Sequence, residues 1–330
     1  RIENKHMKQI LMTGVGAYLP ETILTNDDLG KFVDTDDNWI RQRTGIISRR
    51  KANPEELTSD LAVKAANQAL LSSGINISDI DCIIVATTTP DCTFPSTATI
   101  VQEKLGAHNA FAFDVQAVCA GFVYALSVAN GLMSAGQGSN TLVIGAETFT
   151  KLLDWSDRST CVLFGDGAGA VVLQAEKSEE GYGIIANTLH SDGRYKDILY
   201  VDGGVSSTGT IGHVKMQGRD VFKHAVEKLA ASMDEVLHIS NLTSDDIDWL
   251  VPHQANIRII NAMQKKLNLP DEKVIKTVSH HANTSAASIP LALTSGVESG
   301  QIKSGHLLAL EAIGGGLSWG ASLVRYGRPV

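Results

Sequence analysis

The 330-residue sequence is short of several kinds of residue, and each shortage excludes a class of protein. It holds four cysteines and no Cys-x-x-Cys pair, which argues against a secreted disulfide scaffold and favours the cytoplasm. It has no run of about 18 apolar residues, the length that a membrane-spanning helix needs. Its net charge of −8 argues against a nucleic-acid partner, because such binding depends on neutralising phosphates.

The remaining composition is that of an ordinary globular protein, with 43% hydrophobic and 19% charged residues. Residues 1–6 lack the apolar core of a signal peptide, and we expect them to be a cloning remnant ahead of a native start at Met7. Short apolar runs alternate with segments of helical spacing. We expect buried strands at 82–88, 111–115, 141–145 and 170–173, and helices at 57–72 and 119–135. This alternation predicts an α/β or layered α/β/α architecture.

The two halves of the sequence resemble each other. Asp81 aligns with Asp248 at an offset of 167 residues, and Tyr124 aligns with Leu291 at the same offset. We therefore predict two copies of one βα unit, residues 7–178 and 179–330, that divide in the polar stretch 176–183. The alignment places the segment around Cys119 opposite residues 281–285. Equivalent loops of two such units are expected to converge at the carboxyl ends of strands.

Cys119 lies between a predicted strand and a predicted helix. Unpaired N–H groups and the positive dipole end of a helix lower the pKa of a thiol, and the thiolate is the nucleophile. The alternative is a small buried side chain, which is what most free cysteines are. Cys82 falls inside a predicted strand and is assigned to the core, and Cys92 and Cys161 are assigned structural roles.

His253 and Asn283 are the side chains that would complete a site around this cysteine. His253 follows a predicted strand that ends at Pro252, and Asn283 lies in a stretch of small residues. Neutral histidine and asparagine can each donate a hydrogen bond to one carbonyl oxygen, as enolate formation requires. Taken singly, each could be structural, a satisfied histidine or a capping asparagine. Together with Cys119 they predict a Cys-His-Asn catalytic set.

Other motifs exclude two kinds of site. The Gly-Gly-Gly run at 314–316 lacks a following Lys-Ser/Thr, so we expect a tight turn that lends an oxyanion N–H and no phosphate loop. The glycine-rich run at 164–169 precedes a strand, which argues against dinucleotide binding. His280 and His281 are adjacent and have no other ligands at suitable spacing, so no metal site is predicted.

A basic set stands out from the acidic background. Arg258, Lys265 and Lys266 fall on one side of the helix expected after His253. Further basic residues lie earlier in the same half, namely Lys215, Arg219 and Lys223. The set is either a solvated face or a cleft mouth that attracts an acidic carrier or nucleotide phosphates.

In order and spacing, these motifs resemble those of the β-ketoacyl-acyl carrier protein synthase III family, the initiating condensing enzymes of bacterial fatty acid synthesis. The resemblance spans residues 7–326 and rests on five segments, 114–126, 164–169, 253–258, 281–288 and 314–320. It implies a thiolase-like, five-layered α-β-α-β-α sandwich of two duplicated halves, and a homodimer. It also implies an acyltransferase that condenses acetyl-CoA with malonyl-acyl carrier protein, giving acetoacetyl-acyl carrier protein, without a cofactor.

The resemblance assigns roles residue by residue. Cys119 accepts the acyl group, His253 and Asn283 serve decarboxylation, and the backbone N–H groups of Cys119 and Gly315 hold the oxyanion. Coenzyme A contacts fall on Thr35, Trp39, Arg158 and Asn256. Phe94 is implied to shape the acyl pocket across the dimer interface, and acyl carrier protein is implied to dock on Lys223, Arg258, Lys265 and Lys266.

Departures from the family pattern leave the primer open. Ala282 stands where the family usually has glycine, and Ser159 and Arg219 replace residues that are more often glycine and asparagine. A longer or branched acyl-CoA primer, or a polyketide-type synthase, is the alternative. A papain-like protease also uses cysteine, histidine and asparagine, but its Cys-Gly-Ser-Cys-Trp motif is absent. A non-catalytic carrier-binding relative would be expected to lose one of the three residues.

Overall fold

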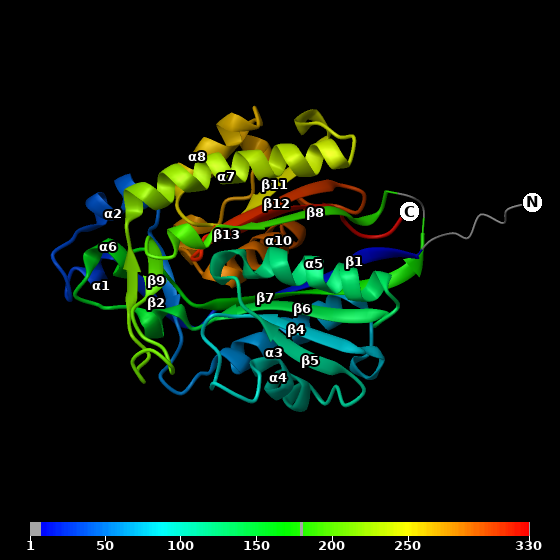
Figure 1. Ribbon diagram of the computed structural model, residues 1–330, viewed down its shortest axis with the longest axis horizontal. Coiled ribbons are helices and arrows are strands. Elements are labelled where there is room, and N and C mark those ends of the chain that lie inside the picture. The colour runs from blue at the N-terminus through cyan, green and yellow to red at the C-terminus, as the bar shows by residue number, and fades with distance from the viewer. Residues whose placement is uncertain (1–7, 179–180, 330) are drawn as a thin grey trace, which may run out of the picture.

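The computed structural model describes residues 8–178 and 181–329, which form five stacked layers in the order α-β-α-β-α (Figure 1). The expected cloning remnant at residues 1–6 lies outside the described residues. The expected boundary between residues 178 and 179 falls at the edge of the undescribed pair 179–180.

The first sheet has five strands in the order β1-β7-β6-β4-β5. These strands are β1 (Lys8–Tyr18), β4 (Cys82–Ala86), β5 (Phe111–Val115), β6 (Asn140–Glu147) and β7 (Gly167–Lys177). β4 runs parallel to β5 and β6, whereas β7 is antiparallel to both of its neighbours. Two helices, α3 (Thr58–Ser73) and α4 (Thr97–Leu105), cover its outer face.

The second sheet has four strands in the order β11-β12-β13-β8. They are β8 (Gly183–Ser191), β11 (Trp249–Pro252), β12 (Leu307–Gly314) and β13 (Ser318–Arg325). Its outer face carries α7 (Gly218–Ile239) and α8 (Ile257–Lys266). The layer between the two sheets consists of α5 (Gly121–Ser134) and α10 (Ser288–Glu298).

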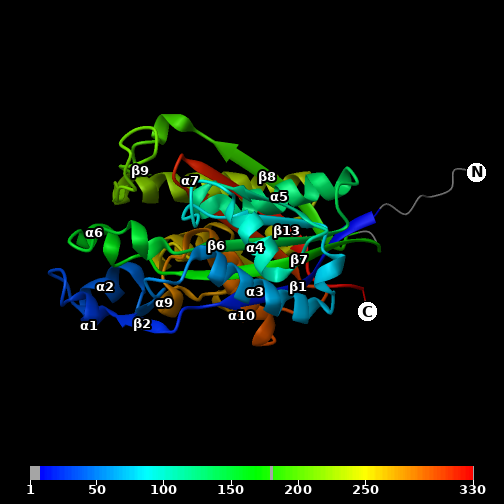
Figure 2. The same cartoon turned by 90° about the horizontal axis from the view of Figure 1, so that it is seen from below.

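Short elements gather at one end of the sandwich, as Figures 1 and 2 both show. There the strand pair β2 (Thr22–Thr25) and β3 (Ser48–Lys51) lies near α1 (Asn26–Leu29), α2 (Asp37–Thr44), α6 (Arg158–Cys161) and α9 (Val278–His281). A second pair, β9 (Leu199–Val201) and β10 (Val214–Met216), reaches the same end. Single 3₁₀ turns complete the chain: η1 (Ile77–Asp79), η2 (Val118–Ala120), η3 (Phe149–Leu152), η4 (Gly193–Tyr195), η5 (Ser244–Asp246), η6 (Asp271–Lys273) and η7 (Ser285–Ala287).

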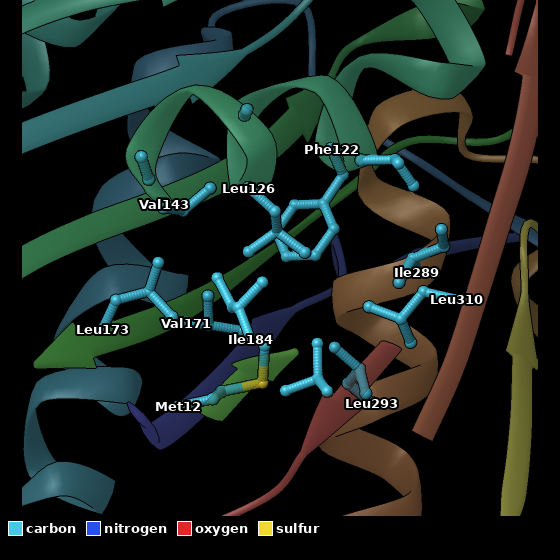
Figure 3. Packing of buried hydrophobic residues seen from close by; sticks show 14 of the residues in the cluster. Met12, Phe122, Leu126, Val143, Val171, Leu173, Ile184, Ile289, Leu293 and Leu310 are labelled. Atoms are coloured by element: carbon cyan, nitrogen blue, oxygen red, sulfur yellow. The ribbon is translucent and has the colours of Figure 1, made fainter. Parts of the chain in front are cut away.

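The main core fills the space between the sheets and the two central helices. Figure 3 shows Phe122 of α5 and Ile289 of α10 packing against strand residues such as Val143 and Leu310. Both helices are covered on two sides, which explains their nearly continuous apolar sequence. Burying each large apolar side chain contributes about 1.5–3 kcal/mol, so this layer holds the two sheets together.

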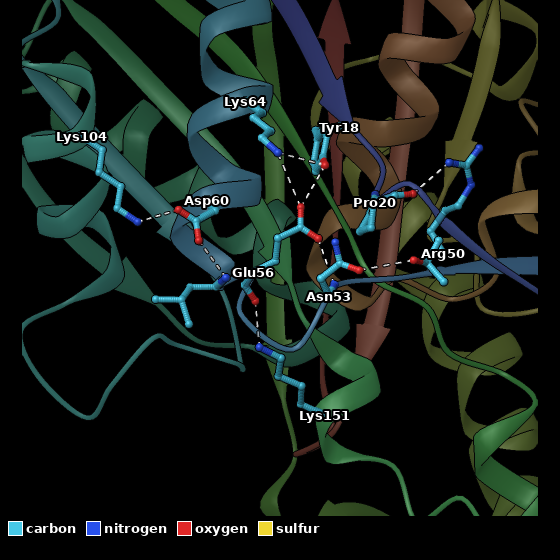
Figure 4. A network of polar contacts seen from close by, with 11 residues as sticks. Tyr18, Pro20, Arg50, Asn53, Glu56, Asp60, Lys64, Lys104 and Lys151 are labelled. Atoms are coloured by element: carbon cyan, nitrogen blue, oxygen red, sulfur yellow. Dashed lines mark hydrogen bonds and ion pairs between the residues drawn. The ribbon is translucent and has the colours of Figure 1, made fainter.

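A polar network on the surface attaches the segment before α3 to its neighbours (Figure 4). The Glu56 carboxylate accepts hydrogen bonds from the Tyr18 hydroxyl and from the Asn53 backbone N–H, both at 3.0 Å. Lys151 Nζ donates to the Glu56 carbonyl oxygen at 2.8 Å. Exposed ion pairs such as Lys64–Glu56 contribute at most about 1 kcal/mol, so this network orients the segment more than it stabilises the fold.

The structure confirms the duplicated architecture. Four pairs of elements begin 167 residues apart, namely η1 and η5, η2 and η7, α5 and α10, and β6 and β12. Even an unusual backbone conformation repeats, since Val118 has φ +50° and its counterpart Ser285 has φ +52°. The predicted alignment of the segment around Cys119 with residues 281–285 is wrong in detail, however. At this offset Cys119 is equivalent to Ala286, and Asn283 lies three residues earlier in its own copy.

The predicted strands and helices are all present, with ends that differ by a few residues. The expectation that every strand is buried on both faces is wrong for β5. Phe111 at the start of β5 is 44% exposed, because β5 is the last strand of its sheet. Strand order is a property of the folded chain, which a local apolar run does not encode. Cys82 is buried as expected, whereas Cys92 lies in an exposed loop.

Candidate active site

Cys119, His253 and Asn283 line one cleft with a volume of about 480 Å³. The cysteine comes from η2 after β5, the histidine from the loop after β11, and the asparagine from the loop between α9 and η7. The three loops belong to both halves of the chain. The structure therefore brings together the Cys-His-Asn set that the sequence predicts.

The environment of Cys119 differs from the expected one. Its side chain is buried just ahead of α5, as expected, but burial raises the pKa of the thiol to about 12. The nearby Ser285 hydroxyl and the backbone N–H of Cys119 lower this pKa, and the nearby Glu147 carboxylate raises it. The predicted net lowering is wrong, because desolvation outweighs the helix end. The thiol is therefore protonated at rest, and its reaction requires a proton acceptor.

His253 is held where a neutral imidazole is favoured. Its backbone N–H donates to the Glu311 carbonyl oxygen at 2.8 Å, which continues the β11–β12 pairing by one residue. Burial lowers the pKa of the imidazole to about 3, so it stays neutral at physiological pH. Its Nδ1 atom is buried and has no hydrogen-bond partner among the described residues.

Asn283 is fixed by the glycine-rich run at 164–169. Its N–H donates to the Leu163 carbonyl at 2.9 Å, and its carbonyl accepts from the Gly165 N–H at 3.0 Å. Its side-chain Oδ1 accepts from the Ser285 N–H at 2.9 Å, which leaves the Nδ2 amide group as the free donor. The run that resembles a nucleotide motif therefore positions the asparagine.

Gln254 joins the histidine and asparagine loops, and sequence reasoning missed it. Its Nε2 donates to the carbonyl oxygens of Pro252 and Ile275, at 2.9 and 3.1 Å. Its Oε1 accepts from the N–H groups of Thr277 and Val278, at 2.9 and 3.0 Å. The only signal in the sequence is a polar residue directly after a buried strand and beside His253.

The departure at Ala282 places an alanine in a strained conformation. Ala282 has φ +59° and ψ −160°, a region that is essentially restricted to glycine and costs about 1–3 kcal/mol for other residues. We expect Ala282→Gly to raise the free energy of unfolding by about 1 kcal/mol, after subtracting the extra backbone entropy of glycine. Urea unfolding followed by circular dichroism measures this change.

Ala287 provides the matched control, because it is also fully buried but has φ −80° and ψ −15°. Ala287→Gly is expected to lower the free energy of unfolding by about 1 kcal/mol. A similar loss in Ala282→Gly would show that the conformation at 282 is not strained.

The predicted oxyanion turn lies beside Cys119. The 314–316 run connects β12 and β13, and a Cβ atom on Gly314 would come within 2.5 Å of the Cys119 backbone nitrogen. Gly315 lines a second cavity of about 370 Å³. Val118 and Phe149 line both cavities, so the second adjoins the first next to the thiol.

Only some of the residues implied to bind coenzyme A line the cleft. Trp39 and Asn256 line the cleft. The Arg158 guanidinium lies 4.7 Å from the centre of the Trp39 ring, and Arg43, which the sequence analysis missed, lies 4.4 Å from it. Thr35 lies outside the lining residues, and its hydroxyl is buried without a hydrogen-bond partner in the described chain.

The remaining predicted residues lie on the surface. Phe94 is 83% exposed and lies outside both cavities of the single chain. The basic residues on α7 and α8 are all exposed, namely Lys223, Arg258, Lys265 and Lys266. Arg258 also lines the cleft, so this basic surface begins at its mouth.

Two kinds of feature are absent from the described ranges, 8–178 and 181–329. Those ranges contain no cluster of three or more histidine, cysteine, aspartate or glutamate side chains arranged to hold a metal ion. Their helices include none with the length and apolar character needed to cross a membrane.

Known proteins match nearly the whole chain, and two family models match about half of it. Residues 113–193 match the family model "3-oxoacyl-[acyl-carrier-protein] synthase III", and residues 237–326 match the model for the C-terminal part of that enzyme. Beta-ketoacyl-[acyl-carrier-protein] synthase III of Ruegeria pomeroyi is 59% identical over 96% of this chain and 98% of its own length. The protein of the same name from Hyphomonas neptunium is 57% identical over 96% and 99%.

Solved structures agree in fold. The 3-oxoacyl-[acyl-carrier-protein] synthase III of Aquifex aeolicus is 45% identical, with a TM-score of 0.91 over 97% of this chain and all of that one. A priming β-ketosynthase from the R1128 polyketide pathway is 33% identical, with a TM-score of 0.92 over 98% of both chains.

Proposed function

Because the chain belongs to the 3-oxoacyl-[acyl-carrier-protein] synthase III family, we propose that it condenses acetyl-CoA with malonyl-acyl carrier protein. The products are acetoacetyl-acyl carrier protein, coenzyme A and carbon dioxide, and the reaction starts type II fatty acid synthesis. The observation that carries the proposal is a single cleft lined by a thiol and two neutral hydrogen-bond donors. The chemistry needs no cofactor beyond the two substrates.

The first stage transfers the acetyl group to Cys119. The thiolate attacks the thioester carbonyl, and coenzyme A departs. The backbone N–H groups of Cys119 and Gly315 donate to the oxyanion that forms. The position of the 314–316 turn beside the Cys119 backbone supports this assignment.

The second stage decarboxylates the malonyl group. His253 and Asn283 donate hydrogen bonds to the malonyl thioester oxygen and stabilise the enolate that forms as carbon dioxide leaves. The resulting carbanion attacks the acetyl group on Cys119. An imidazole that stays neutral and an asparagine whose Oδ1 is already occupied both support donor roles.

Two surfaces serve the substrates in this proposal. Trp39, Arg158 and Asn256 bind coenzyme A. The predicted coenzyme A contact at Thr35 stays a prediction, which the cleft geometry does not support. The carrier protein docks on the basic residues of α7 and α8, which attract an acidic partner to a chain of net negative charge. The second cavity, next to Cys119, receives the acyl chain of the primer.

The chain acts as a homodimer in this proposal. β5 offers an unpaired sheet edge in the described chain, and exposed apolar side chains accompany it, among them Phe94 and Phe111. Phe94 then completes the acyl pocket of the partner subunit. The cytoplasmic location expected from cysteine usage stays a prediction.

A panel of acyl-CoA primers tests the proposed function. The protein is mixed with malonyl-acyl carrier protein and acetyl-CoA, or with longer or branched acyl-CoA, and the acyl carrier protein products are identified by mass spectrometry. We expect acetyl-CoA to give the highest kcat/KM. A preference for branched or longer primers would assign the chain to the alternative, and release of no carbon dioxide from any mixture would refute a condensing enzyme.

A further inference from the structure

Glu147 is a buried carboxyl group that the proposed reaction leaves without a role. It is the last residue of β6 and has no exposed surface. It lies close enough to Cys119 for its charge to raise the pKa of the thiol. A buried carboxylate is costly unless it is hydrogen-bonded, so its presence beside the nucleophile requires an explanation.

The hydrogen bonds around Glu147 have a fixed direction. The Thr148 N–H donates to Thr89 Oγ1 at 3.0 Å, and the Thr89 N–H donates to Thr87 Oγ1 at 3.1 Å. Each hydroxyl therefore keeps its own proton to donate to the Glu147 carboxylate. The distance to Glu147 Oε2 is 2.5 Å from Thr89 Oγ1 and 3.2 Å from Thr87 Oγ1. The Thr88 N–H is a third donor at 3.2 Å. All of these donors are neutral, so they solvate the carboxylate without neutralising it.

The result is a carboxyl group that can gain or lose a proton near neutral pH. Burial raises the pKa of Glu147 to about 7, and the neighbouring donor groups of Thr89, Thr88, Ser285 and Thr87 limit that rise. A group with a pKa near the working pH is the most effective general base. The other two groups titrate far from neutrality, the thiol near 12 and the imidazole near 3.

Ser285 connects the carboxyl group to the thiol. It lies in η7, which packs against η2, where Cys119 lies, and against β6, which ends at Glu147, and its hydroxyl lowers the pKa of both groups. Its Oγ atom is buried and has no hydrogen-bond partner in the described chain. The backbone is held by the bond from its N–H to Asn283 Oδ1. The hydroxyl is therefore available to pass a proton between the two groups.

We propose that Glu147 accepts the proton of Cys119 through the Ser285 hydroxyl during acyl transfer, stores it in the acyl-enzyme, and returns it when condensation expels the thiolate. This inference rests on the proposed function and adds the proton acceptor that the buried thiol requires. Glu147 and Ser285 act on Cys119 and make no bond to the substrate.

The protons and electron pairs balance over the cycle. In the first stage the Cys119 S–H proton moves to Ser285 Oγ as the Ser285 proton moves to Glu147. The sulfur bonds to the acetyl carbon, the carbon–sulfur bond to coenzyme A breaks, and the coenzyme thiolate takes a proton from water. In the second stage the electron pair left by carbon dioxide forms the new carbon–carbon bond. Cys119 leaves as a thiolate and regains its proton from Glu147. One solvent proton is consumed, and it ends on coenzyme A.

The pH dependence of acetylation follows from the groups that face Glu147. Cys119 faces it from η2, Ser285 from η7, and three threonines from the segment after β4, and of these only Cys119 titrates. Acetylation is therefore expected to require ionised Glu147. Its rate should rise with pH, with a midpoint near 7, and level off above pH 8.

Single-turnover acetylation by acetyl-CoA tests the relay. Intact-mass spectrometry of quenched samples follows the reaction between pH 5.5 and 9. Glu147→Gln and Ser285→Ala are expected to slow acetylation at pH 8 about 100-fold, the lower end of the range for general-base catalysis. In both variants the rate should keep rising above pH 8, because attack then depends on the unassisted thiol. A new cavity or a lost hydrogen bond alone would not change the shape of the pH–rate profile.

Glu311→Gln is the matched control. Glu311 is also fully buried, burial raises its pKa to about 8, and both carboxyl oxygens lack partners in the described chain. Its replacement is expected to keep the midpoint near 7. Loss of the midpoint in Glu311→Gln, or native rates and midpoint in Ser285→Ala, would overturn the relay. If Glu147→Gln does not fold, Ser285→Ala still decides. Absence of acetylation in the native protein would instead refute the proposed function.

Discussion

Replacing Cys119 with alanine is expected to abolish acetylation of the protein and to lower condensation by about 10⁴-fold or more, the scale seen when a nucleophile is removed. Decarboxylation of malonyl-acyl carrier protein should continue, because the enolate is stabilised by His253 and Asn283 and not by the thiol. Intact-mass spectrometry after incubation with isotope-labelled acetyl-CoA measures the first effect. Release of labelled carbon dioxide measures the decarboxylation.

Cys161 offers a control of the same residue type. It is buried in α6, and burial raises the pKa of its thiol to about 11. Cys161→Ala is expected to be acetylated as fully as the native protein. Full labelling of Cys119→Ala would show that another residue is the nucleophile, and the two-stage assignment would fail.

Removing either neutral donor is expected to affect mainly the second stage. Loss of one oxyanion-type donor costs about 3 kcal/mol, so His253→Ala and Asn283→Ala should each slow decarboxylation by about 10²–10³-fold. His253→Ala should still be acetylated at Cys119. Asn283→Ala should also slow acetylation modestly, because the Ser285 N–H loses its acceptor. Stopped assays of carbon dioxide release and of protein acetylation separate the two stages.

The protonation state of His253 gives this prediction a pH component. Burial lowers its pKa to about 3, below the ordinary value of 6.5, so the imidazole is neutral throughout the pH range 5–9. Decarboxylation is therefore expected to be flat over that range, in contrast to acetylation. If His253→Ala lost acetylation as completely as decarboxylation, the imidazole would be the base that activates Cys119, and Glu147 would not be.

Sequence patterns predicted the helices and strands that are determined by the residues of the segment itself. Phe111–Val115 is a strand with the predicted bounds, and the strand before His253 ends at Pro252 as predicted, because each is a short apolar run that ends at a turn. The Cys-His-Asn set was also accessible, since each of its members follows such a run or a stretch of small residues. The duplicated offset predicted that the loops of Cys119 and Asn283 converge.

Other properties depend on contacts between distant segments. Burial raises the pKa of the Cys119 thiol, and three elements of the second half of the chain, η7, β12 and β13, pack against η2. Gln254 and Glu147 were missed because a single polar residue at the end of a buried strand has no periodic signature. Each could have been noticed as a polar residue next to an apolar run, which is a weak signal.

The matching backbones of η2 and η7 carry a consequence for the history of the molecule. Val118 and Ser285 have the same left-handed φ in the two copies, yet Val118 precedes the nucleophile whereas Ser285 is the proposed proton carrier. An ancestor of half this length that paired with itself would have presented the same corner twice at its symmetry axis. Fusion of two such copies leaves the corners free to diverge, so unlike side chains can stand on one shared backbone conformation.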